Sequence, residues 1–170
     1  MHLSAGDLLR KEQRTPGSQY GDLIAECIVS SRIVPVEITC GLLERAMCAS
    51  VEGRTGDDAG RFLIDGFPRN QDNYDGWQRL MSGKTDVAFV LYFDSPEDVC
   101  MQRCLRRGAA GSGRTDDNED SLRKRMVTFT KETWPIVQLF AEQGKVRSVA
   151  GCGDQEQVFE DVKRIFAQFK

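Results

Sequence analysis

Short apolar runs alternate along the chain with segments of helical periodicity. The runs at 62–66 (FLIDG), 86–94 (DVAFVLYFD) and 145–150 (KVRSVA) are apolar or β-branched and precede loop or helix signals, as buried parallel strands do. The opening residues 2–4 (HLS) form a candidate fourth strand. Because helical patterns lie between these runs, the sequence predicts an α/β fold, with a parallel sheet covered by helices on both faces.

Three segments carry the clearest helical signals. One begins at Ser95, which is followed by a proline and two acids, an order that suits an N-cap and a first helical turn. A longer segment at about 118–142 contains Pro135, which predicts a bend because proline removes a backbone donor and clashes with the preceding turn. The last is a covering helix with apolar residues at helical spacing: Val158, Val162, Ile165, Phe166 and Phe169.

Two polar, glycine-rich stretches separate these elements. Residues 107–114 combine small residues with flanking arginines and precede Asp116 and Asp117, so the sequence predicts a mobile loop there. Residues 52–60 predict a plain connector between a helix and a strand.

The size and charge of the chain exclude several classes of protein. Its 170 residues fit one domain. A net charge of −3 provides no chain-wide cationic field for nucleic acid or membranes. The longest apolar stretch, 87–93, is far shorter than the roughly 20 residues that span a bilayer, and the N-terminus lacks the order of a signal peptide. We therefore expect a cytoplasmic protein with no nucleic-acid or membrane partner. A monomer, and the nucleus as a second compartment, are further expectations that these features do not establish.

The cysteines and the single histidine limit the chemistry further. Six cysteines allow three disulfides, but without an export signal we favour buried free thiols. Cys100 and Cys104 share a helix face, yet the histidine is His2 and no CxxC pair completes a zinc site. The same scarcity of histidine argues against Ser–His or Cys–His catalysis.

The most informative segment, 65–73 (DGFPRNQDN), directly follows a predicted buried strand. Ligands bind at the carboxyl ends of strands in open α/β sheets. Arg69 offers a planar fork of donors to a phosphate, and three amide side chains offer donors and acceptors to a heterocycle: Asn70, Gln71 and Asn73. The segment therefore predicts a pocket for an anion and a base, with a polar turn before a capped helix as the alternative reading.

Arginines gather near the predicted loops and helix ends. Each alone is a solvated surface cation, but several that converge suit phosphoryl transfer, which is catalysed mainly by positioning and charge neutralisation. They are Arg10, Arg69, Arg103, Arg106, Arg107, Arg114, Arg123 and Arg125.

Five segments in order give the chain a family resemblance. They are HLSAGDLLR at 2–10, GSQYGDLI at 17–24, IVPVEIT at 33–39, FLIDGFPRNQDN at 62–73 and GRTDDN at 113–118. The chain resembles the nucleoside monophosphate kinases of the adenylate kinase superfamily, most of all the eukaryotic UMP/CMP kinases. The resemblance implies a P-loop NTPase-like sheet and transfer of the ATP γ-phosphoryl group to CMP or UMP, with dCMP as a further acceptor and Mg²⁺ accompanying ATP.

The resemblance also implies an acceptor site, with residues 4–34 as the segment that binds the monophosphate. Arg10 and Arg69 would hold the phosphate, Asn73 would read the pyrimidine edge, and Asp65 would orient the waters of magnesium. The other acceptor-side residues that it implies are Ser4, Gly6, Arg32, Ile33, Val34, Gly66, Phe67 and Pro68.

On the ATP side, the resemblance implies a short lid without zinc at 107–117. Arg107 would face ATP, and Arg114 and Arg125 would reach the transferring phosphates when the lid closes. Arg103 would lie near adenine, which Gly153 would contact through its backbone. The stretch 109–113 is slightly longer than is usual in UMP/CMP kinases.

The family's phosphate-binding loop, GxxxxGK[ST], does not occur in the printed sequence. GKT at 83–85 lacks the earlier glycine and is rejected as a substitute. We therefore expect a chain truncated at its N-terminus, without the central strand that lies between strands 62–65 and 87–93 by family analogy. A pyrimidine-nucleotide-binding module without catalysis is the alternative function, and adenylate kinase proper is a weaker one.

Overall fold

The computed structural model describes residues 1–52 and 60–169 and divides into two compact units, Met1–Thr85 and Asp86–Lys170. We describe each unit by itself. Most of the connector expected at 52–60 lies outside the described residues.

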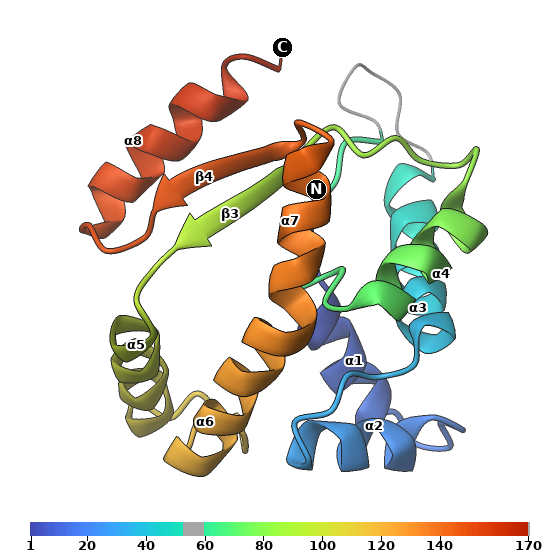
Figure 1. Ribbon diagram of the computed structural model, residues 1–170. Helices are drawn as coiled ribbons and strands as arrows, with labels where there is room; N and C mark the ends of the chain where they lie inside the picture. Colours follow the sequence, from blue (N-terminus) through green and yellow to red (C-terminus); the bar gives the residue numbers. More distant parts are fainter. Residues whose placement is uncertain (53–59, 170) are drawn as a thin grey trace. The chain divides into compact units, whose positions relative to one another are not determined.

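The first unit places helices around a two-stranded parallel sheet (Figure 1). Leu3 pairs with Ile64 in the sheet, and Ser4 pairs with Asp65, so the strands expected at 2–4 and 62–66 are confirmed. The elements are β1 (His2–Ser4), α1 (Ala5–Gln13), α2 (Gly21–Val29), α3 (Val36–Val51), β2 (Leu63–Asp65) and α4 (Gln71–Met81).

Helix α3 is shared by two apolar clusters of this unit. Ile38 and Leu42 pack in a cluster with Ile24 of α2. Leu43 and Met47 pack in the other cluster, with side chains from β1 and α4. Helix α3 buries apolar residues on two faces, so the turn that precedes it and helix α4 both pack against the same helix.

The second unit also contains a two-stranded parallel sheet, in which Tyr92 of β3 pairs with Ser148 of β4. Figure 1 shows the two strands side by side, with α8 next to β4. The elements are β3 (Val90–Asp94), α5 (Glu97–Ala109), α6 (Glu119–Thr128), the π-helical turn η1 (Phe129–Thr133), α7 (Trp134–Glu142), β4 (Val146–Ala150) and α8 (Gln155–Phe166).

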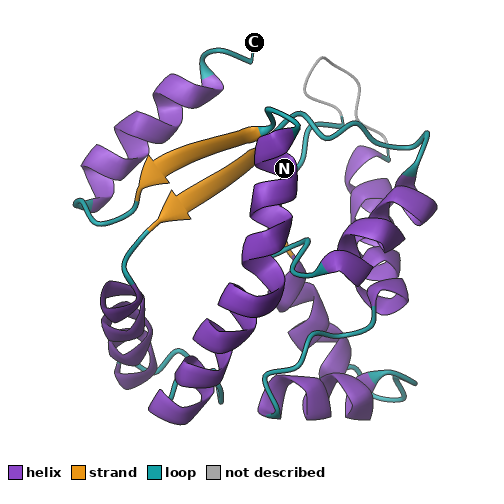
Figure 2. Ribbon diagram, in the orientation of Figure 1, coloured by secondary structure: helices purple, strands orange, loops and turns teal. Residues whose placement is uncertain are grey.

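Strand β3 is covered by helical residues on both faces (Figure 2). Just before the strand, Phe89 contacts Phe166 and Phe169, with ring centroids 5.2 and 4.4 Å away. Tyr92 contacts Phe129 and Trp134 at 6.4 and 5.5 Å. Residues 89 and 92 have opposite parity, so they point to opposite faces of an extended chain, which confirms helices on both faces of this pair.

Two expectations for this unit need correction, and a third takes a specific form. The strand expected from residue 86 begins at Val90, because its partner begins only at Val146. Helix α5 begins after Pro96 without a side-chain cap, so Ser95 is not its N-cap. The bend at Pro135 takes the form of the π-helical turn before α7, since proline cannot donate the bond of a regular turn.

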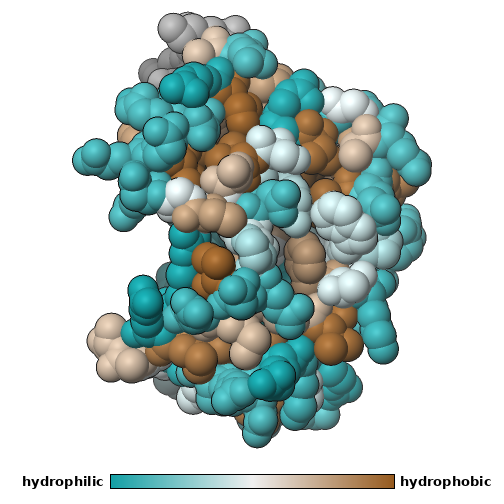
Figure 3. Space-filling view, turned by 60° about the vertical axis from the view of Figure 1, so that its left-hand side comes forward, coloured by the Kyte–Doolittle hydropathy of each residue, from teal (hydrophilic) through white to brown (hydrophobic). Residues whose placement is uncertain are grey.

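All six cysteines are free, but the expectation of buried thiols holds for Cys27 and Cys40 alone. Cys100 and Cys104 are partly buried, and Cys48 and Cys152 are exposed. Among the described residues, β2 pairs only with β1, and β3 only with β4. Strands β2 and β3 are the two that the family analogy places on either side of the central strand. On the face in Figure 3, hydrophilic residues predominate and apolar residues form separate groups.

Candidate nucleotide sites

The turn after β2 is built by one glycine, one proline and two amide side chains. Gly66 has a φ of +75°, which glycine adopts without strain, and the Phe67–Pro68 peptide bond is cis. The Asn70 side chain then caps α4 by accepting a hydrogen bond from the Asn73 N–H at 2.9 Å. The alternative reading, a polar turn before a capped helix, is therefore correct as a local description.

Asn73 has a feature that capping does not explain. Its side chain is buried, with 2% of the residue exposed, and its Oδ1 accepts a hydrogen bond from the Arg69 N–H at 3.2 Å. Its Nδ2 is buried and has no hydrogen-bond partner among the described residues. A buried donor without a partner costs about 1–3 kcal/mol, so within the described residues this amide lacks the hydrogen bond that would offset its burial.

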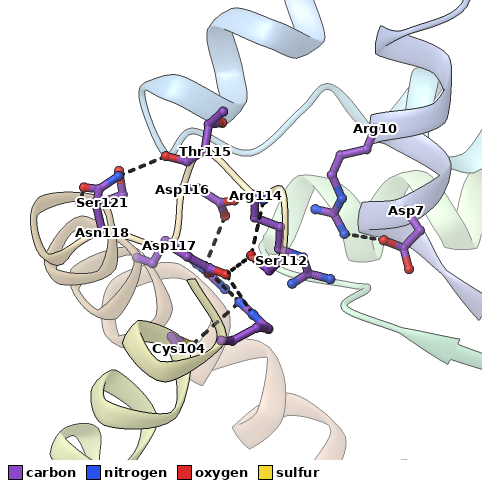
Figure 4. Close-up of polar contacts among 12 residues, drawn as sticks. Asp7, Arg10, Cys104, Ser112, Arg114, Thr115, Asp116, Asp117, Asn118 and Ser121 are labelled. Carbon is purple, nitrogen blue, oxygen red and sulfur yellow. Dashed lines mark hydrogen bonds and ion pairs between the residues drawn. The ribbon is translucent and has the colours of Figure 1, made fainter. Parts of the chain in front are cut away.

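The predicted phosphate-binding arginine, Arg10, lies in the last turn of α1, and its side chain reaches back over the first turn. Ser4 caps the helix by accepting from the Asp7 N–H at 3.2 Å, and Arg10 donates to Asp7 Oδ1 at 2.5 Å (Figure 4). The guanidinium lies over Gly6, where a Cβ would come within 3.2 Å of Arg10 Nη2. Gly6 thus leaves the space that Arg10 occupies, near the positive end of the helix dipole.

The turn between α2 and α3 is anchored through the other predicted residues. Arg32 pairs with Glu26, and its Nε donates to Ser30 Oγ at 3.0 Å. The Val34 side chain belongs to the apolar core, with 6% of the residue exposed. A ligand over this turn would therefore meet the Val34 backbone rather than its side chain.

Two contacts bring the acceptor-side segments together within the first unit. The register of the sheet aligns Ser4, before α1, with Asp65, before the DGFPR turn. At the far end of the α2–α3 turn, Val36 packs against Gly76, one helical turn beyond Asn73. The segments that carry the predicted acceptor residues therefore converge at one end of this unit's sheet.

The second unit contains a pocket of about 490 Å³ at the end of β3. The predicted Arg103 and Gly153 both line it. Arg103 donates to the Gly151 carbonyl at 2.6 Å and to the Gly153 carbonyl at 3.4 Å, so it also shapes the turn after β4. The complete lining is Phe93, Ser95, Arg103, Gly151, Gly153, Asp154, Gln155 and Val158.

Gly151 also lines this pocket, and sequence reasoning missed it. A Cβ there would overlap Ser95 Oγ and lie 3.3 Å from the Asp94 carbonyl oxygen. The sequence shows only a glycine in a turn, and the close approach depends on the pairing of β3 with β4.

An ion pair joins the two ends of the predicted lid. Arg107 donates to both oxygens of Asp117, from Nε at 2.8 Å and from Nη2 at 2.6 Å (Figure 4). The Asp117 side chain is 1% exposed and accepts a third bond from Ser112 Oγ at 2.9 Å. Hydrogen bonds from Arg107 lower the pKa of Asp117 from 3.8 to about 2, and the same contact raises the pKa of Arg107.

A second ion pair supports the same loop. Arg125 lies 3.2 Å from Asp116, and the Arg114 N–H donates to Ser112 Oγ at 3.3 Å. Gly108 is required by close packing, because a Cβ there would lie 2.8 Å from the Asp117 carbonyl oxygen. From the sequence, Asp116 and Asp117 were noted only because they follow the loop. Their ion pairs with two of the predicted catalytic arginines were missed.

Comparison with known proteins identifies the family of the chain. The family model described as "Adenylate kinase" matches residues 1–145. The chain belongs to the adenylate kinase family. It is 52% identical over 165 residues to the UMP-CMP kinase of Gallus gallus and 50% identical over 165 residues to that of Homo sapiens, covering 97% of this chain and 83% of each relative. It is 53% identical over 167 residues to the UMP-CMP kinase of Xenopus laevis, covering 97% of this chain and 84% of the relative.

As a member of the adenylate kinase family, the chain is by family a nucleoside monophosphate kinase, that is, a phosphotransferase. Its mixed α/β elements and parallel strand pairs agree with the expected P-loop NTPase-like fold. In the part of this family member that the structure describes, no helix is both long and apolar enough to cross a membrane, and no group of three or more His, Cys, Asp or Glu residues is arranged to hold a metal ion.

Proposed function

We propose that this chain binds CMP and UMP, with dCMP as a further acceptor, and transfers the ATP γ-phosphoryl group to them. The observation that carries the proposal is the buried, unpartnered Nδ2 of Asn73. Cytosine and uracil both present a carbonyl oxygen at C2, so one amide donor serves both bases. The relatives from Gallus gallus and Homo sapiens, both named UMP-CMP kinase, support the same acceptors.

The phosphate of the acceptor is assigned to Arg10 and Arg69. A guanidinium presents two parallel donors, which match two phosphate oxygens. Arg10 is already placed over the first turn of α1 by its bond to Asp7. Around these two arginines, residues 4–34 form the acceptor segment, with contacts from Ser4 and Gly6, from the turn Arg32–Ile33–Val34 and from the turn Gly66–Phe67–Pro68.

The donor nucleotide is assigned to the second unit. The pocket at Arg103 and Gly153 would take adenine, and Arg107, Arg114 and Arg125 would serve the phosphates, with 107–117 as the lid. Phosphoryl transfer needs positioning and neutralisation of charge more than covalent chemistry. The exposed carboxylate of Asp65, at the end of β2, fits the Mg²⁺ that accompanies ATP, since magnesium favours oxygen ligands and retains its waters.

Replacing Asn73 with aspartate is expected to weaken binding of CMP and UMP at least tenfold. The substitution keeps an oxygen to accept the Arg69 N–H but removes the NH₂ donor, and it places a carboxylate beside the base carbonyl. Calorimetric titration measures the affinity, and circular dichroism verifies folding. Asn118→Asp is the matched control. The Asn118 oxygen caps α6, which aspartate does equally well, and the substitution likewise removes an NH₂ donor, the one bonded to the Thr115 carbonyl at 3.0 Å, outside the acceptor segment. Unchanged CMP affinity in a folded Asn73→Asp chain would contradict the role of Asn73.

Transfer itself is tested with a coupled assay of ADP release in the presence of CMP, ATP and Mg²⁺. The second candidate function, binding of pyrimidine nucleotides without transfer, is favoured by the lack of GxxxxGK[ST] among the printed residues. Release of ADP that depends on CMP supports the kinase. Tight CMP binding with no ADP release by this chain supports the binding module instead.

A further inference from the structure

Ser31 has an unusual backbone conformation. Among the described residues it is the non-glycine residue with a positive φ, at 55°. It directly follows α2, and its N–H donates to the Ile28 carbonyl at 3.2 Å, while the Arg32 N–H donates to the Cys27 carbonyl at 2.9 Å. This pair of bonds defines a Schellman C-cap, whose left-handed position is usually glycine because other side chains are strained there.

The hydroxyl of Ser31 adds a second cost. Its Oγ is buried and has no hydrogen-bond partner among the residues that the structure describes. The neighbouring Ser30 differs, since its Oγ donates to the Glu26 carbonyl at 2.7 Å. Glycine at position 31 would avoid both the strained backbone and the buried, unpartnered hydroxyl. The local fold therefore does not explain a serine here.

The position of the hydroxyl is fixed by the core on both sides of the turn. Cys27 and Val34, 3% and 6% exposed, belong to the same apolar cluster. The turn between them ends at Val36, which packs against Gly76 of α4, one helical turn from Asn73. In the described residues, Ser31 and Asn73 are the two side chains with a buried, unpartnered nitrogen or oxygen, and both belong to segments that meet around the proposed acceptor site.

We propose that the Ser31 hydroxyl forms a hydrogen bond with the nucleoside part of the bound pyrimidine nucleoside monophosphate. This inference rests on the proposed function, because it concerns the same acceptor site. A hydroxyl both donates and accepts, so it can pair with a sugar hydroxyl or a base carbonyl. The phosphate is assigned to Arg10 and Arg69, so the Ser31 contact is independent of the phosphate. Residual strain at this residue is typical of a functional position.

The test compares the wild-type chain with Ser31→Gly and Ser31→Ala by calorimetric titration with CMP and, separately, with inorganic phosphate. Both variants are expected to weaken CMP binding by about 3- to 10-fold, the size of one lost hydrogen bond. Phosphate binding should not change. Ser31→Gly should also raise the urea midpoint of unfolding, so the same substitution stabilises the chain and weakens its ligand binding.

Ser50→Ala is the matched control, because the Ser50 hydroxyl has a partner, the Ala46 carbonyl at 2.6 Å, and lies at the other end of α3. It should leave CMP affinity unchanged. A stabilised Ser31→Gly chain that binds CMP like the wild type would overturn the inference while leaving the proposed function intact. An equal loss of CMP and phosphate binding would also overturn it. Failure of the folded wild-type chain to bind CMP would overturn the proposed function and the inference together.

Discussion

Replacing Gly76 with alanine is expected to destabilise the first unit by about 2–3 kcal/mol, although alanine is the better helix former. A Cβ at position 76 would overlap the Val36 side chain, coming within 2.6 Å of its Cγ1 and 3.0 Å of its Cβ. Val36 is fully buried at the start of α3, so it has no open space into which to move. Urea unfolding followed by circular dichroism measures the change.

Gly41→Ala provides the matched control for this prediction. Gly41 lies inside α3, and a Cβ there would meet no neighbour within 4 Å. Alanine at this position should stabilise the chain by up to about 1 kcal/mol. The double variant Gly76→Ala with Val36→Ala should recover part of the loss, because the smaller side chain at 36 makes room. A Gly76→Ala chain as stable as Gly41→Ala would show that α3 and α4 do not pack as closely as described.

Replacing Asp117 with asparagine is expected to lower the free energy of unfolding at pH 7 by about 2–3 kcal/mol. It should also make the free energy of unfolding less dependent on pH in the acid range. The carboxylate is buried and holds both donor nitrogens of Arg107. Its pKa of about 2 lies below the ordinary 3.8, so the stabilisation is complete above the ordinary pKa. It is lost as the pH falls through about 2.

Unfolding in urea at pH 7, 5 and 3 measures this linkage. The difference between the wild type and Asp117→Asn should be constant from pH 7 to pH 5 and should fall to about half near pH 3. Asp154→Asn is the control in the same unit, because Asp154 caps α8 by accepting from the Gln157 N–H and asparagine caps as well. Parallel stability profiles for the wild type and Asp117→Asn would contradict the role assigned to the ion pair.

The sequence predicted the features that depend on local chemistry. Alternation of apolar runs and helical periodicity predicted the parallel α/β elements, and Asp65 to Asn73 predicted a turn at a strand end. Arg103 and Gly153 were named together, by family resemblance, and they line one pocket. The elements and the turn rest on residue type and order along the chain, which a single sequence displays directly, whereas the pairing of Arg103 with Gly153 came only from the resemblance.

The features that escaped prediction depend on contacts across the chain. Asp117 is ten residues from Arg107, and their pairing requires the loop between them to fold back. The unpartnered Nδ2 of Asn73 is recognised only in the structure, where the Oδ1 of the same side chain accepts from the Arg69 N–H. The strain at Ser31 is a property of φ rather than of residue type. Such features depend on which residues the folded chain brings into contact, and neither periodicity nor composition reveals those contacts.

The two ion pairs at the base of the lid have a consequence for how this loop tolerates insertion. With Arg107 bound to Asp117, and Arg125 to Asp116, the ends of the loop are fixed whatever its length. The entropy of closing a flexible loop grows slowly, by about 0.6 kcal/mol for each doubling of its length. Extra length at 109–113, which the family resemblance implies, would thus be accommodated at little thermodynamic cost, and the same positions would suit the insertion of a peptide tag or a fluorescent reporter that tests whether the predicted lid moves.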